Sequence, residues 1–105
     1  MDVTTLTEEA LRTLETMSNQ STIDQLFNQY LTDVMALSPS WTKLEWEQAI
    51  PQVAKVMYIA KNAGGTKDLI AYHPDFRQFS LSVKNAGLGH HELYNLIRPI
   101  YEVYN

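Results

Sequence analysis

The sequence predicts an all-α fold, a compact bundle of four to five helices within a single domain spanning residues 1–105. Three observations support this prediction. Apolar residues recur at spacings of three and four along most of the chain, which is the period of a helix with one buried face. Residues that cap or stop helices separate these segments. The composition, with 45% hydrophobic and 19% charged residues, is that of a folded domain with one core.

The first helix is expected to begin near Thr5. Thr5 and Glu8 have the spacing of a capping box, in which each side chain satisfies a free backbone N–H at the helix start. Apolar residues then recur up to Met17, and the polar run over residues 18–21 ends the pattern. The sequence therefore predicts a first helix that ends before residue 18.

The second helix has the clearest period. Its expected buried stripe consists of Ile23, Leu26, Phe27, Tyr30, Leu31 and Val34. Thr22 is the candidate cap at its start. Pro39 is expected to end it, because a proline disfavours helical geometry in the residue before it.

The third helix is expected to begin at Thr42, which forms a second capping box with Glu45. Pro51 lies inside the apolar pattern and predicts a kink or a restart, because it lacks an N–H and crowds the preceding turn. Gly64 and Gly65 are typical of a helix C-terminus and predict the end of this helix.

Residues 66–87 allow two interpretations. Phe76, Phe79 and Val83 match a helical stripe, and the length of the segment favours a helix. Phe79, Leu81 and Val83 also alternate with serines, as in a strand. The alternative to an all-α fold is therefore an α+β fold with one small hairpin at about residues 68–84.

The last helix is predicted to run from about His90. Its apolar stripe consists of Leu93, Leu96, Ile97, Ile100, Tyr101 and Tyr104. Pro99 interrupts this stripe as Pro51 interrupts the third helix, so we expect a second proline kink.

The charges divide unevenly along the chain. Residues 1–50 carry a net charge of −6 and residues 51–105 a net charge of +2. An acidic first half repels phosphates, which argues against nucleic-acid binding, while the asymmetry favours head-to-tail self-association or a protein partner. The chain has no cysteine, no apolar run long enough to span a membrane, and no signal-peptide pattern at Met1–Thr7. We expect a cytoplasmic protein, or a virion component if a phage encodes it.

No motif for catalysis or for a cofactor is recognised. His90 and His91 are adjacent, so on a helix they point about 100° apart and are poorly placed for one metal ion. The run Gly64–Gly65–Thr66–Lys67 lacks the upstream glycine and strand of a phosphate loop, and a helix C-cap explains it better. The sequence predicts no catalytic residue, no metal site and no cofactor.

Tyrosines are the residues that point to a function. Tyr94, Tyr101 and Tyr104 are spaced to lie on one side of the last helix, with Arg98 between them. Tyrosine offers a large contact area with a polar tip and is common in protein interfaces. We expect these four residues to contact a partner, and Glu8 and Glu15 on the acidic first helix to steer it.

Short segments resemble two families of small helical proteins. Ser38–Pro39–Ser40–Trp41 and Leu96–Ile97–Arg98–Pro99–Ile100–Tyr101 resemble head-completion (connector) proteins of tailed phages, which assemble into rings. Val56–Met57–Tyr58 and Ala86–Gly87–Leu88 resemble bacteriocin immunity proteins, although those are often basic. The first resemblance implies a non-catalytic structural component that self-assembles or docks through protein contacts. The second implies a monomeric immunity or adaptor protein with a separate partner.

Overall fold

The computed structural model describes residues 2–104, which form five α-helices and two short 3₁₀ turns. The elements are α1 (Val3–Leu14), α2 (Gln20–Leu37), η1 (Ser38–Ser40), α3 (Lys43–Asn62), η2 (Leu69–Tyr72), α4 (Phe76–Asn85) and α5 (His90–Tyr104). The predicted all-α bundle is confirmed. No helix within residues 2–104 has the length and apolar character needed to cross a membrane.

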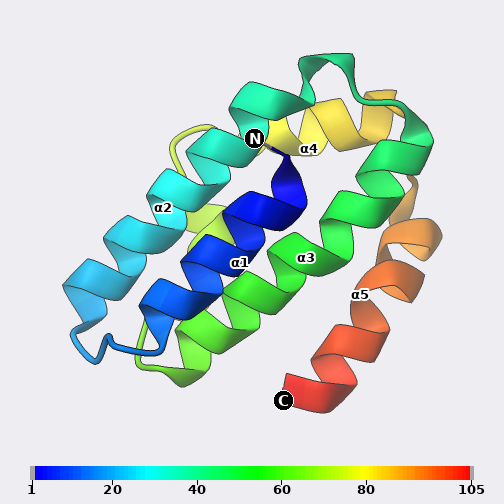
Figure 1. Ribbon diagram of the computed structural model, residues 1–105. Helices are drawn as coiled ribbons and strands as arrows, with labels where there is room; N and C mark the ends of the chain where they lie inside the picture. The colour runs from blue at the N-terminus through cyan, green and yellow to red at the C-terminus, as the bar shows by residue number, and fades with distance from the viewer. Residues whose placement is uncertain (1, 105) are drawn as a thin grey trace.

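The helix α3 is the centre of the bundle (Figure 1). Helix α1 packs against both α2 and α3, and α5 lies along α3. The core is one cluster of buried side chains, with Trp46 of α3 the largest that is fully buried. The Trp46 ring meets the rings of Trp41 and Phe79 edge-on, with centroids 4.9 and 5.6 Å away. Trp46 thus joins α4 to the start of α3.

The helix starts show where local signals were ambiguous. The cap of α1 is Asp2, whose Oδ1 accepts a hydrogen bond from the Thr5 backbone N–H at 2.9 Å. The cap of α2 is Asn19, whose Oδ1 accepts from the Thr22 N–H at 3.2 Å. Both predicted threonine caps are therefore wrong, because an Asp or Asn three residues upstream caps at least as well. The capping box of Thr42 at the start of α3 is confirmed.

The hairpin expected as an alternative at residues 68–84 does not form, since no strand occurs within residues 2–104. Phe79 and Val83, one helical turn apart, are both buried. Leu81, which a strand would place on their side, is 45% exposed. The helical stripe therefore buries more of the apolar surface of this segment than the alternating one.

His73 ties the segment before α4 to α2. Its buried ring accepts a hydrogen bond at Nδ1 from the Asp75 backbone N–H at 3.0 Å, so the proton of the neutral ring lies on Nε2. Nε2 lies 2.9 Å from Oγ1 of Thr32, whose hydroxyl donates to the Asn28 carbonyl. This chain of hydrogen bonds satisfies a buried polar side chain and fixes the route of the backbone into α4.

Both helical prolines lie inside continuous helices. Pro51 is within α3 and Pro99 within α5, so neither helix restarts at its proline. Each proline removes one backbone hydrogen bond of its helix. The bend at each position stays a prediction.

Candidate contact surface and apolar groove

Polar contacts fix α5 to α3 at both ends. Near the start of both helices, Lys43 Nζ and Glu92 Oε2 form an ion pair at 2.9 Å, which raises the pKa of Lys43. At their last turns, Nδ2 of Asn62 donates to the Tyr104 backbone oxygen at 2.8 Å. The two helices therefore run parallel. None of the residues of α5 is fully buried, although it is 15 residues long.

The outward side of α5 carries three of the predicted contact residues. Tyr94 is 62% exposed, Tyr101 is 47% exposed, and Arg98 lies between them one turn from each. Arg98 Nε donates to Glu102 Oε1 at 2.8 Å, and this contact raises the pKa of Arg98. We call Tyr94, Arg98 and Tyr101 the α5 surface. The Arg98 guanidinium is already paired with Glu102, so the α5 surface offers mainly its two aromatic rings for contact.

Two residues of α3 extend this surface. The rings of Tyr58 and Tyr101 meet edge-on with centroids 5.9 Å apart. Lys61 Nζ lies 6.0 Å from the centroid of the Tyr58 ring. The pKa of Tyr58 is raised, mainly by partial burial of its phenol and to a smaller extent by the neighbouring Tyr101. Sequence reasoning did not assign Tyr58 and Lys61 to a contact site, because only the packing of α5 on α3 brings them there.

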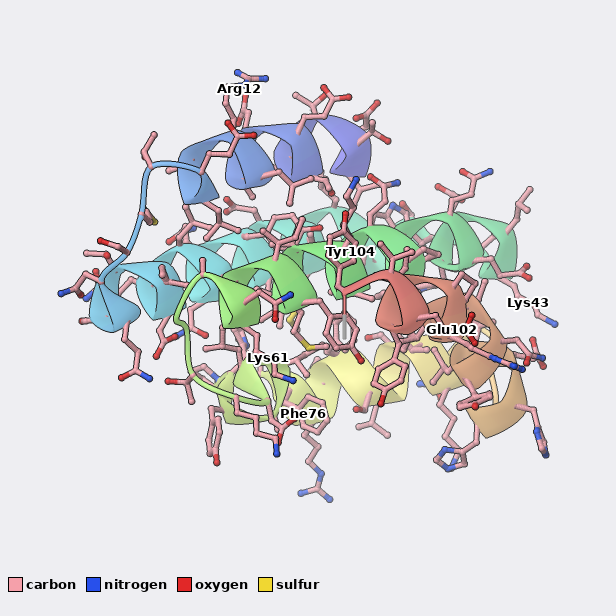
Figure 2. All side chains as sticks on the ribbon, turned by 90° about the horizontal axis from the view of Figure 1, so that it is seen from below. Arg12, Lys43, Lys61, Phe76, Glu102 and Tyr104 are labelled. Atoms are coloured by element: carbon pink, nitrogen blue, oxygen red, sulfur yellow. The ribbon has the colours of Figure 1, made fainter. Side chains whose placement is uncertain are left out.

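The remaining predicted contact residues lie elsewhere. Tyr104 is half-buried, and its backbone oxygen accepts a hydrogen bond from Asn62. It is therefore less exposed than Tyr94 and Tyr101 and is not part of the α5 surface. Glu8 is exposed on α1, and Glu15 is exposed as the C-cap that follows it. Figure 2 shows Arg12 of α1 at one edge of the molecule and Phe76 of α4 at the opposite edge. Helices α1 and α5 lie on opposite sides of α3 (Figure 1), so the acidic side chains of α1 belong to a surface separate from the α5 surface.

An apolar groove of about 480 Å³ lies between α3, α4 and α5. Each of these helices presents one stripe to it at spacings of three and four residues. The lining residues are Ile50, Val53, Ala54, Met57, Ile70, Phe76, Phe79, Ser80, Val83, Lys84, Leu88, Gly89, His90, Leu93 and Ile97. We call this space the groove.

Only a few polar side chains reach the groove. They are Ser80 and Lys84 of α4 and His90 of α5, and no acidic residue among residues 2–104 lines the groove. Lys84 is exposed and forms no ion pair within residues 2–104. The sequence indicates an apolar stripe for this segment if it is helical, but not the groove that the stripe faces. The period of a helix shows which side is apolar, but not whether a neighbouring helix covers it completely.

The glycine pair after α3 is a helix cap, as the sequence predicts. The Gly64 N–H donates to the Lys61 oxygen at 3.1 Å and the Gly65 N–H to the Ala60 oxygen at 2.9 Å, the paired bonds of a Schellman motif. Gly64 has φ +116°, which favours glycine. The Thr66 N–H donates to Oδ1 of Asp24 at 2.8 Å. A carboxylate therefore occupies the backbone donor that a phosphate would need.

The histidines do not come together with other ligands. Within residues 2–104, no group of three or more histidine, aspartate or glutamate side chains is placed to hold a metal ion. No protein-family model, curated protein or solved structure matches the chain. Function is therefore inferred from the α5 surface and the groove.

Proposed function

We propose that this protein is a non-catalytic structural component that self-associates through the α5 surface. The observation that carries the proposal is the exposure of Tyr94 and Tyr101 on either side of Arg98. Large exposed aromatic side chains on one helix face are typical of residues that become buried against a protein partner.

The energetics of this surface suit a protein contact. A tyrosine loses little side-chain entropy when it is immobilised, and it buries a large area while its hydroxyl stays hydrogen-bonded at the rim. Arg98 is paired with Glu102, so covering it would not bury an unpaired charge. Contacts by Tyr94 and Tyr101 are thus expected to supply most of the binding free energy.

Charge favours a second copy of this chain as the partner. Exposed Glu8 and Glu9 of α1 and Glu15, its C-cap, outnumber the one exposed base there, Arg12. Lys61 lies beside the aromatic cluster at Tyr58. The acidic side of one copy can then face the Lys61 end of the α5 surface of the next. Such a head-to-tail contact joins two different surfaces and generates a ring or a filament. A ring is also what the resemblance to phage connector proteins implies.

A separate partner protein is the second candidate, as in an immunity or adaptor protein. It uses the same α5 surface, since the exposed tyrosines fit any protein with an apolar pocket. The two candidates differ in one observable: an adaptor is a monomer of 12.0 kDa when it is alone in solution.

Sedimentation velocity of alanine variants tests the proposal. We expect wild-type protein to sediment as an oligomer, and the Tyr94→Ala/Tyr101→Ala variant as a 12.0 kDa monomer. Tyr72→Ala is the matched control, because Tyr72 is 71% exposed on η2 outside the α5 surface. Far-ultraviolet circular dichroism checks that each variant keeps its helices. A double variant that sediments like the Tyr72→Ala control would contradict the proposal.

A further inference from the structure

The groove has the size and lining of a small-molecule site. The space of about 480 Å³ between α3, α4 and α5 is lined mostly by apolar side chains. Small-molecule sites fall in the range of about 300–1,000 Å³ and are mostly apolar with a few polar groups. The stripe of Ile50, Val53 and Met57 on α3 faces Ile97 of α5 across this space.

The polar groups at the groove select the charge of its occupant. Lys84 and His90 can donate hydrogen bonds to a ligand, and in the described part of the chain no carboxylate lines the groove to repel an anion. Gly89 lines the groove and directly precedes α5, so the positive end of that helix dipole lies beside it. Glu92 in the first turn of α5 is paired with Lys43 and is not part of the groove lining. An anionic group is therefore favoured over a neutral or cationic one.

We propose that the groove binds a hydrocarbon chain that ends in a carboxylate, such as a fatty acid. The chain would lie against the apolar stripes of the three helices, and the carboxylate would lie at Lys84 and His90. Helix α5 forms the third wall, and its two ends are held to α3 by the Lys43–Glu92 ion pair and the hydrogen bond from Asn62 to the Tyr104 oxygen.

Calorimetric titration of the full chain with dodecanoate tests this proposal. We expect one molecule bound per chain below the concentration at which dodecanoate aggregates. Dodecanol and dodecylammonium have the same chain length and are the matched ligands. Dodecanol should bind more weakly and dodecylammonium weakest, because only the carboxylate is attracted to the charge of Lys84. Equal affinity for dodecylammonium and dodecanoate would overturn the proposal.

Two exposed lysines provide the matched variants. Lys84→Glu should weaken dodecanoate binding about fivefold, the order expected for an exposed charge pair. Lys67→Glu makes the same charge change outside the groove and should leave binding unchanged. Equal effects of the two variants would show a general charge effect and overturn the assigned carboxylate position.

Methyl nuclear magnetic resonance locates the ligand. Signals of Ile50 and Ile97 should shift on addition of dodecanoate, because both residues line the groove. Ile23 is fully buried outside the groove lining and should not shift. A groove that serves a helix of a partner protein would bind none of the three small ligands, and that result would overturn the proposal.

Discussion

Replacing Gly65 with alanine tests whether the turn after α3 is required for packing. A Cβ at Gly65 would lie 2.8 Å from Cγ2 of Ile23 and 2.9 Å from the Ala60 backbone oxygen. Ile23 is completely buried, and the Ala60 oxygen already accepts the Gly65 N–H at 2.9 Å, so neither atom can shift freely. Overpacking at such a site costs about 1–3 kcal/mol. A stiffer unfolded chain offsets roughly 0.4–1 kcal/mol of this cost.

The expected net effect is a loss of about 1–2 kcal/mol in the free energy of unfolding, measured by urea denaturation followed by circular dichroism. Gly89→Ala is the matched control, because a Cβ there meets no atom within 4 Å. It should change the free energy of unfolding by less than about 0.5 kcal/mol. Equal stability of the Gly65→Ala and Gly89→Ala variants would refute the packing argument.

Two further predictions concern the core. Burial raises the pKa of Tyr30 to about 12, from an ordinary value of 10.0. The protonated phenol is therefore favoured in the folded state, and its contribution to stability is complete below pH 10 and is lost as the pH rises toward 12. Between pH 9 and pH 11, the free energy of unfolding measured by urea denaturation should fall less for Tyr30→Phe than for wild type. An equal fall in both proteins would contradict this prediction. Trp46→Ala should lower the free energy of unfolding by about 3–5 kcal/mol, because Trp46 is fully buried. The control variant Leu44→Ala should have nearly the wild-type stability in thermal denaturation, since Leu44 is largely exposed. A similar loss of stability in both variants would argue against Trp46 as a centre of the core.

The helices could be predicted from the sequence because their signals are local. The apolar period predicts four to five helices, with only the segment that forms α4 left open between a helix and a hairpin. The capping box of Thr42 and the stop at Gly64 lie where the sequence predicts them. The starts of α1 and α2 were placed too late, because Thr5 and Thr22 have Asp2 and Asn19 upstream as competing caps. The sequence alone does not decide which of two nearby residues caps a helix, since aspartate, asparagine and threonine have similar capping free energies.

The arrangement of the candidate site could be predicted only in part. Tyr94 and Tyr101 are exposed on one side of α5 with Arg98 between them, as their spacing indicates, but Tyr104, predicted on the same side, is half-buried. The contact of Tyr101 with Tyr58 joins residues 43 positions apart and depends on how α5 packs on α3. The groove depends in the same way on the packing of three helices. Its apolar stripes could be found from the sequence, but the space between them could not.

Photo-cross-linking from position 101 tests the proposed self-association most directly. A photoreactive phenylalanine analogue replaces Tyr101, which is 47% exposed on the α5 surface, and mass spectrometry locates the cross-links. The proposal predicts covalent dimers in which position 101 of one copy is joined to α1 of another, near Glu8 and Glu15. The same analogue at exposed Tyr72 should give no such dimers. Equal dimer yields from the two positions, or no dimer from position 101 over a series of protein concentrations, would contradict it.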